Sequence, residues 1–441
     1  MLGLALVALA LLIGGGGVAG PAQAMIVEVA AALALGWLLV FAPIDFTERC
    51  LRAPILWLLA FAAVVAIQLI PLPPGLWRAI PGKQLEATTA DLIGMQHVWR
   101  PIALVPENAV RSAIALVPCA AIFLLLYRGS EATLARIGWL FAGFAVINAC
   151  LGLMQSYGGV DGAYLFETSH RGNAVGLFAN RNHFALFEVI GLVWLTAGVR
   201  GLRVQGLGVL LGAILAFGLI LLAIVASGSR SGAAIGLVTA SLLPLFLVPD
   251  RWRGWFVILW VAGVAAAIAL IAAGVGLYPD SSLGRLLNRY ATGDVEQEGR
   301  WDYWANTLYV IRQSFPFGTG LGGFVPAYQA NEPLSDVSRL LTNHAHNDYL
   351  ELVLELGLAG AALILAGLAW LALRARRGIA TLGFGLTPFH AALLSVLVVA
   401  AGSLTDYPVR TYAVAAVLAA CLAIVAGGLP RADNNLRRTA K

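Results

Sequence analysis

The chain has 441 residues, of which 60% are apolar and only 12% are charged. This composition excludes a soluble globular domain and predicts a protein whose main solvent is lipid. The net charge of +5 does not indicate a surface for nucleic acid, because the arginines stand in ones, twos and threes between apolar runs, as charges that orient membrane helices do.

Long apolar runs recur from the N-terminus to the C-terminus. A run of about 17 to 25 residues is long enough to cross a bilayer as a helix. Backbone groups in lipid must be paired internally, and the runs lack the alternation of a β-barrel, so they predict an all-α polytopic membrane protein with about 12 transmembrane helices. The predicted spans are 2–20, 25–43, 54–72, 109–127, 135–156, 183–199, 204–226, 231–249, 255–278, 349–373, 387–404 and 411–428.

Basic residues beside these runs predict the orientation. With the N-terminus in the cytoplasm, nearly all of these arginines fall on the cytoplasmic side, and the short connections on the other side carry only Arg230 and Arg410. This asymmetry predicts a multi-pass protein of the bacterial inner membrane with both termini in the cytoplasm. The run ending at Ala22-Gln23-Ala24 fits a cleaved signal peptide or a retained helix, and the missing basic region before it favours the retained helix.

Three segments on the periplasmic side are too long to be simple turns: 73–108, 157–182 and 279–348. The last connects the ninth and tenth predicted spans, and we expect it to form a large, partly helical periplasmic loop. No repeat, low-complexity tract or change of composition marks a second domain, so residues 1–441 are expected to form a single membrane domain. The four cysteines are far apart and argue against a cysteine metal site.

The segment from Thr342 to Glu351 is the strongest candidate for chemistry, because it places two imidazoles, two amides and two carboxylates directly before an apolar helix. A neutral imidazole of His344 or His346 would take a proton from an attacking sugar hydroxyl, and Asp348 or Glu351 would hold its tautomer. We therefore expect a catalytic histidine here.

Two other interpretations of this segment stay open at this stage. It would also serve as a polar cap at the start of the following helix, with Asn343 or Asn347 as the N-cap residue. Zinc ligation by His344 and His346 is a poor match, because their i, i+2 spacing comes without H-E-x-x-H or a nearby cysteine. The sequence therefore favours a site without a metal.

A turn of small residues at 227–232 brings Arg230 to the external boundary between two long helices. A guanidinium there suits bidentate capture of phosphate oxygens, and the small neighbours let a headgroup come close. The simpler alternative is an arginine that snorkels from a helix end.

Arginines also stand in two other external motifs. Arg171, and Arg181 with Asn182, precede the helix that begins near residue 183, and the scarcity of acidic neighbours indicates an anionic ligand. Arg300 precedes Trp301-Asp302-Tyr303-Trp304, whose aromatic faces suit sugar rings but are also typical of interfacial belts.

Three glycines, Gly318, Gly320 and Gly323, formally match the pattern G-x-G-x-x-G. No β-strand pattern precedes them, and they lie on the external side of the membrane. We therefore expect a flexible loop rather than a dinucleotide site.

Taken together, these motifs resemble the O-antigen ligase and O-antigen polymerase superfamily of membrane glycosyltransferases. The resemblance rests on Phe178–Ala185, on Ser229–Gly232, on Gly299-Arg300 and, most specifically, on the stretch from His344 to Gly357. It extends over roughly residues 55 to 425, with the early helices matching only in character. It implies a helical membrane fold of the GT-C-like kind.

The resemblance also implies the reaction. Such enzymes take a glycan from an undecaprenyl-diphosphate donor on the periplasmic side and pass it to an acceptor hydroxyl with inversion, without a nucleotide sugar, a required metal or another cofactor. By resemblance, Arg230 and Arg300 would hold the diphosphate and His346, or its neighbour His344, would activate the acceptor. The further residues expected to bind substrate are Arg171, Arg181, Asn182, Asn347, Asp348 and Glu351.

Several acceptors and roles remain open from the sequence. The acceptor would be another lipid-linked repeat in a polymerase, lipid A-core in a ligase, or a protein hydroxyl in an oligosaccharyltransferase, and the loops slightly favour a surface or exopolysaccharide polymerase. Other polysaccharide-assembly proteins would be its partners. The alternatives without catalysis are a flippase for a lipid-linked glycan, which the nearly charge-free spans disfavour, and an inactive assembly partner.

Overall fold

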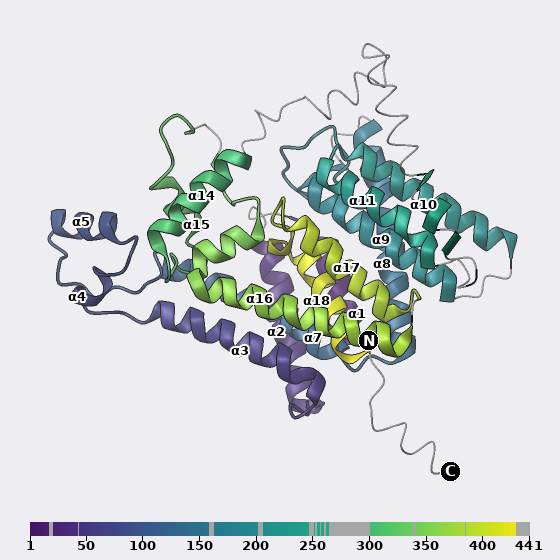
Figure 1. Ribbon diagram of the computed structural model, residues 1–441, viewed down its shortest axis with the longest axis horizontal. Helices are drawn as coiled ribbons and strands as arrows, with labels where there is room; N and C mark the ends of the chain where they lie inside the picture. The colour runs from purple at the N-terminus through teal and green to yellow at the C-terminus, as the bar shows by residue number, and fades with distance from the viewer. Residues whose placement is uncertain are drawn as a thin grey trace.

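A computed structural model shows how these segments are arranged (Figure 1). It describes residues 1–16, 21–42, 44–157, 163–201, 206–246, 300–337, 341–383 and 385–428, with a few single positions between 251 and 263. Within these ranges the regular elements are helices, apart from one isolated bridge between Leu72 and Arg100. The expected helical fold class is confirmed for this part of the chain.

Seven stretches of helix in the described ranges are long and apolar enough to cross a membrane. They are α2 (Pro21–Phe41), α3 (Arg49–Leu69), α6 with α7 (Pro106–Ile114 and Val117–Leu126), α8 (Glu131–Tyr157), α9 (Arg181–Gly201), α10 (Leu207–Ala226) and α16 (Asp348–Leu382). Four shorter apolar helices coincide with further predicted spans: α1 (Leu2–Ile13), α11 (Arg230–Leu242, continued by the 3-10 turn Leu243–Phe246), α17 (Pro388–Gly402) and α18 (Tyr412–Gly427). The span predicted at 255–278 lies almost entirely outside the described residues, so the total of twelve stays a prediction.

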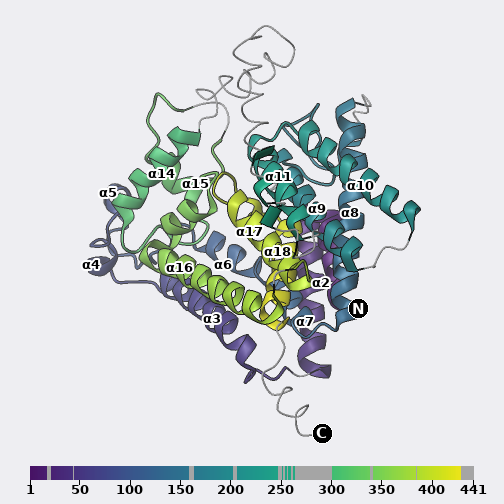
Figure 2. The same ribbon diagram turned by 45° about the vertical axis from the view of Figure 1, so that its right-hand side comes forward.

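Helix α9 forms the centre of the bundle, because it is apolar on all sides and buried along most of its length. It packs against α8, α10, α11 and α17, and Figure 2 shows these helices grouped around it. Small residues allow close packing: Gly138 of α8 lies against the ring of Trp194, whose Nε1 donates a hydrogen bond of 3.0 Å to Ser395 Oγ on α17. The second half of α9 is thereby held between α8 and α17.

Helices α3 and α16 lie side by side in a second group (Figures 1 and 2). Phe61 and Val65 of α3 pack against Leu356 and Leu363 of α16. The short helices α4 (Pro74–Trp77), α5 (Gln84–Leu92), α14 (Arg300–Ser314) and α15 (Phe324–Gln329) lie beyond the ends of these spans. The described part of the large loop, residues 300–337, is therefore partly helical.

Helix α16 breaks at Gly357, whose φ of 60° is not helical. The glycine loop from Gly318 to Gly323 fills this break. Thr319 N donates to Leu354 O (3.0 Å), Gly320 N donates to Glu355 O (2.9 Å), and Leu358 N donates to Pro316 O (2.9 Å). The loop is thus held against α16, which corrects the expectation of a flexible loop and explains its glycines: Gly318 has a positive φ, and an added Cβ would meet the backbone of α16.

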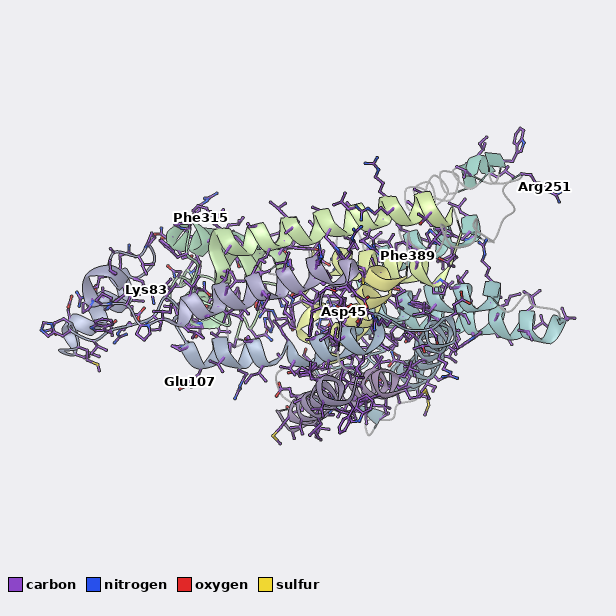
Figure 3. The ribbon with its side chains drawn as sticks, turned by 90° about the horizontal axis from the view of Figure 1, so that it is seen from below. Asp45, Lys83, Glu107, Arg251, Phe315 and Phe389 are labelled. Carbon is purple, nitrogen blue, oxygen red and sulfur yellow. The ribbon has the colours of Figure 1, made fainter. Side chains whose placement is uncertain are left out.

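Basic side chains make contacts at the end of the helices opposite the large loop. Lys83, Glu107 and Phe315 mark one end of the molecule in Figure 3, and Arg251 lies at the other. At the end opposite the large loop, Arg128 pairs with Glu48, Arg200 donates to Phe246 O, and Arg374 donates to Val425 O. These basic contacts agree with the predicted cytoplasmic face, while the identity of each face stays a prediction.

Candidate active site

The segment between residues 343 and 347 is fixed by the start of α16. Asn347 is the N-cap: its Oδ1 accepts hydrogen bonds from Tyr349 N (3.0 Å) and Leu350 N (3.1 Å). Its Nδ2 donates to Leu404 O at 3.0 Å, in the loop 403–411 between α17 and α18. The N-cap at Asn347 that the sequence offered is confirmed, and the same residue joins the histidine segment to the loop between α17 and α18.

His346 has a φ of 50°, and among the described residues it is the one non-glycine residue with a positive φ. Such a conformation costs on the order of 1–3 kcal/mol and persists only where the surroundings impose it, which makes it a marker of functional sites. The ring lies 5.8 Å from that of Tyr303 on α14 and 5.0 Å from that of Tyr407, measured between centroids. With a quarter of its side chain exposed, the imidazole remains accessible.

Asp406 is the carboxylate that holds His346. Its Oδ1 lies 3.2 Å from His346 Nδ1 and accepts a hydrogen bond from Tyr407 N at 3.0 Å. Its Oδ2 accepts hydrogen bonds from Asn182 Nδ2 (2.6 Å) and Asn180 Nδ2 (3.3 Å). A carboxylate at Nδ1 selects the tautomer with the proton on that nitrogen and leaves Nε2 to accept a proton.

The environment keeps Asp406 ionised, although it is only 2% exposed. Burial alone would raise the pKa of this carboxyl. Its pKa is nevertheless held below the ordinary value by the hydrogen bond from His346, by the charges of His183 and His346, and by the hydrogen bond from Asn182. An ionised Asp406 stabilises the imidazolium that forms when His346 takes a proton.

A hydrogen-bond chain connects His346 to the turn between α10 and α11. Asn182, whose Nδ2 binds Asp406, accepts at Oδ1 a hydrogen bond of 2.7 Å from Ser229 Oγ. Ser229 is the N-cap of α11, because its Oγ also accepts from Gly232 N at 3.0 Å, and Arg230 is the first residue of that helix. The histidine and the arginine turn, separated by more than one hundred residues of sequence, therefore belong to one site.

Arg181 joins the same site at the first position of α9. The guanidinium of Arg181 lies close to Gly228, in the turn between α10 and α11. A Cβ added at Gly228, which has a φ of +63°, would lie 3.5 Å from Arg181 Nη1 and 3.0 Å from Asn173 Oδ1. Two packed helices thus begin at this face with an arginine at their first position. Helix N-termini present free N–H groups and positive potential, so this arrangement favours an anionic ligand.

His344 has a different set of partners. Its Nδ1 lies 2.8 Å from Glu351 Oε1, and Ala345 N donates to Glu351 Oε2 at 3.0 Å. The Nη2 atom of Arg410 lies 3.2 Å from both Glu351 and Glu355. Of the two carboxylates expected to orient the base, Glu351 orients His344, whereas His346 is oriented by Asp406.

Arg410 pairs with a group of three carboxylates on one face of α16. Besides Glu351 and Glu355, its Nε lies 3.8 Å from Asp348 Oδ1, and Asp348 accepts a hydrogen bond of 2.8 Å from Ser403 Oγ. Burial alone would lower the pKa of the guanidinium, but these three carboxylates raise it above the ordinary value. The group ties the loop 403–411 to α16 and so holds Asp406 near His346.

The two remaining predicted arginines are Arg171 and Arg300. Arg171 is exposed, and its guanidinium carbon lies 5.3 Å from the ring centroid of Tyr164. Arg300 begins α14, and its side chain lies outside the described residues. Among the described residues, no group of three or more His, Cys, Asp or Glu side chains has an arrangement that would hold a metal ion.

Sequence reasoning missed Asp406 and Tyr407 and treated Arg410 only as an exception to the charge asymmetry. All three lie in the short connection 403–411 between α17 and α18. An acidic and a basic residue in this short stretch between two apolar helices were the available signal, since such groups are rare beside lipid and usually have partners.

The chain is similar to a known protein family over part of its length. Residues 215–365 match the family described as O-antigen ligase, which confirms the predicted resemblance to the O-antigen ligase and polymerase superfamily. The match contains Arg230, Arg300, His344 and His346, while Asp406 lies beyond it. It indicates a membrane enzyme of the glycosyltransferase type. A comparison with characterised proteins found no match.

Proposed function

We propose that this protein transfers a glycan from an undecaprenyl-diphosphate donor to an acceptor hydroxyl at the periplasmic face of the inner membrane, most simply as a surface-polysaccharide polymerase. The observation that carries the proposal is the Asp406–His346 pair, joined through Asn182 and Ser229 to the turn that bears Arg230. A base and a group of cations on one face are what a reaction between a hydroxyl and a sugar diphosphate requires.

His346 acts as the general base. Its Nε2 takes the proton of the acceptor hydroxyl as the hydroxyl oxygen bonds to C1 of the donor sugar, and the ionised Asp406 stabilises the imidazolium that results. Positioned proton transfer of this kind contributes about 10²- to 10⁴-fold to a rate. The stacked ring of Tyr303 limits the rotation of the imidazole.

The arginines act on the leaving group. As the bond between C1 and the phosphate oxygen breaks, its electron pair stays on the diphosphate, so negative charge grows in the transition state. Arg230, Arg300 and Arg181 bind these oxygens, with Asn182 and the N-termini of α9 and α11 supporting them, and they stabilise that charge without a metal ion. Attack from the face opposite the diphosphate inverts the anomeric centre. Arg171 extends this basic surface toward the solvent.

The polar residues at the start of α16 have supporting roles. Asn347 caps the helix, and both ends of its amide are already hydrogen-bonded. Glu351 and Asp348 are paired with Arg410, and His344 is held by Glu351. We therefore assign these residues to the support of the site, and His346 to the chemistry.

The test is glycan assembly in cells that carry His346→Ala, Arg230→Ala or Arg300→Ala in place of the native chain. We expect loss of the finished glycan and accumulation of the undecaprenyl-diphosphate-linked donor, with normal amounts of each variant in the membrane. Arg52→Ala is the matched control, because Arg52 is an exposed arginine of α3 and lies on the predicted cytoplasmic side.

Unchanged glycan in all three variants would refute the proposed site. Loss of glycan without accumulation of donor on the periplasmic side would instead indicate a flippase. The products distinguish the acceptors: a polymerase yields long chains on the lipid carrier, and a ligase yields glycan attached to lipid A-core.

A further inference from the structure

His183, in the first turn of α9, is buried with 1% of its surface exposed, yet neither ring nitrogen has a hydrogen-bond partner in the protein. Nothing in the transfer reaction derived above uses this side chain. A buried polar atom without a partner costs free energy, and most such atoms are paired with protein or with an ordered water. The imidazole therefore needs a partner that is not a protein atom.

The nearest acceptor is the carboxylate that holds the catalytic base. His183 Nε2 lies 4.0 Å from Asp406 Oδ2, too far for a direct hydrogen bond. Two hydrogen bonds of about 2.8 Å each, meeting at one oxygen, span this separation with an angle of about 90° at that oxygen. One water molecule therefore fits between them.

A small cavity lies at this place. It is lined by Asn182, His183 and Leu186 of α9, by Ser231 of α11, and by Gly402 and Asp406 near the end of α17. It offers about 10 Å³ to the centre of a water molecule, which is close to the minimum that holds a single water, roughly 10–15 Å³. Its walls supply an imidazole, a carboxylate and a hydroxyl, and a buried water typically makes two to four hydrogen bonds.

We propose that this cavity binds one water molecule that bridges His183 and Asp406, and that His183 is thereby a positioning residue for His346. The water donates to Asp406 Oδ2 and accepts from the imidazole Nε2, and the hydroxyl of Ser231 completes its shell. Tyr407 closes the site on the other side, with its ring in edge contact with His183 at 5.3 Å between centroids.

The bridge has a specific effect on the base. Asp406 Oδ2 already accepts from two asparagine amides, and the water adds a third donor on the side that faces the bundle core. These bonds fix the plane of the carboxylate, so Oδ1 stays aimed at His346 Nδ1. Without the water, Oδ2 keeps only the two asparagine donors, so the carboxylate plane and with it the alignment of His346 are held less firmly.

The test compares variants of the full-length protein in lipid nanodiscs, with lipid-linked glycan extracted from cells that lack the protein. We expect His183→Phe, which keeps the ring volume but cannot bind water, to lower kcat by roughly tenfold, as expected for the loss of one hydrogen bond in the site. KM for the donor should stay unchanged, because His183 touches no substrate. His183→Gln places an amide nitrogen near the position of Nε2, and it should restore most of kcat.

Ser231→Ala removes the hydroxyl from the cavity wall and should lower kcat by roughly threefold. Ser241→Ala, in the last turn of the same helix, is its control, since Ser241 Oγ is exposed and bonds only to Val238 O. A high-resolution map of the native protein should show a water peak within hydrogen-bond distance of His183 and Asp406.

The inference rests on the proposed transfer, and its failure can be told apart from failure of that function. If His183→Phe and Ser231→Ala keep native kcat, or if the map shows no water in the cavity, the bridging water is refuted. The proposed function stands in that case as long as His346→Ala abolishes transfer. If His183→Phe does not accumulate in the membrane, Ser231→Ala and the map still decide the outcome.

Discussion

Two histidine–carboxylate pairs lie side by side at one end of this bundle, and they differ in what surrounds them. In the His344–Glu351 pair, the carboxylate is fully buried, the imidazole is 12% exposed, and Arg410 supplies a second partner to the carboxylate. In the His346–Asp406 pair, the imidazole is 25% exposed, its backbone has a positive φ, and the carboxylate's other partners are asparagine amides and a backbone N–H.

This difference supports the assignment of one pair to structure and the proposal of the other as the reactive pair. Glu351 already has the positive charge of Arg410 beside it, so an imidazolium at His344 gains less stabilisation from this carboxylate. Asp406 pairs with no arginine among the described residues, so its charge acts on His346 at the moment when the imidazole becomes positive. We therefore propose that the same two residue types serve support in one place and catalysis in the other.

The largest expected effect comes from removing the reactive imidazole. His346→Ala should lower the turnover of lipid-linked glycan by about 10²- to 10⁴-fold, because it deletes the proposed base. Turnover per mole of protein in membranes is the measurement, and the exposed His97 on another external segment provides the control His97→Ala. Equal losses in both variants would remove the distinction between His346 and an ordinary surface histidine.

The next effect comes from neutralising the carboxylate of the reactive pair. Asp406→Asn keeps the size of the side chain but no longer fixes the tautomer or stabilises the imidazolium, so turnover should fall roughly 10²- to 10³-fold. Asp336→Asn is the matched control, since Asp336 is exposed and bonds to Asn306 outside the site. Native turnover in Asp406→Asn would contradict the role of Asp406.

In the supporting pair, His344–Glu351, we expect a smaller effect, which falls mainly on the free energy of unfolding. His344→Gln removes one partner of a buried carboxylate that keeps its arginine, so the free energy of unfolding should fall by about 1–3 kcal/mol while turnover falls less than tenfold. Thermal unfolding in detergent and turnover should be measured on the same sample. If turnover were abolished and stability kept, the roles of His344 and His346 would have to be exchanged.

The smallest effect is a dependence of stability on pH. Because the pKa of Asp406 is lower in the folded protein than in the unfolded chain, its ionised form adds stability above the ordinary carboxyl value of about 3.9. That stability is lost only as the pH falls through the lower, folded value. The unfolding midpoint of the native protein should therefore exceed that of Asp406→Asn by roughly 2 °C, without change between pH 5 and 8.

A difference between the two midpoints that vanished already near pH 6 would show that Asp406 is not held ionised by its neighbours. The comparison therefore also tests whether the asparagines and histidines around this carboxylate outweigh the effect of its burial.

The sequence singled out both histidines, but neither of the carboxylates predicted to orient the base is the one that lies against His346. Asp348 and Glu351 are near in sequence, on the helix that follows His346, and so they were the obvious candidates to orient the base. The helix directs both toward Arg410, and Glu351 reaches back to His344 instead. The loop that presents Asp406 comes sixty residues later, and no local pattern pairs it with His346.

The start of α16 shows why the two interpretations of its polar segment do not exclude each other. Asn347 caps the helix, as a local pattern predicts. The cap also fixes the backbone next to His346, where the positive φ turns the imidazole toward the loop of Asp406. The cap and the proposed catalytic histidine therefore share one segment, and spacing alone had no means of separating the two roles.

The sequence by itself determined the solvent, the helical class, the approximate place of most spans and the resemblance to O-antigen ligases, because these depend on local composition and on short motifs. Only the tertiary structure decided which carboxylate serves which histidine, and that Arg181, Asn182 and Arg230 join His346 in one site. Those relations depend on how α9, α11, α16 and the loop after α17 meet at one end of the bundle. Such contacts arise from packing between distant segments, and apolar helices that are similar in composition carry no local signal of which neighbours they will have.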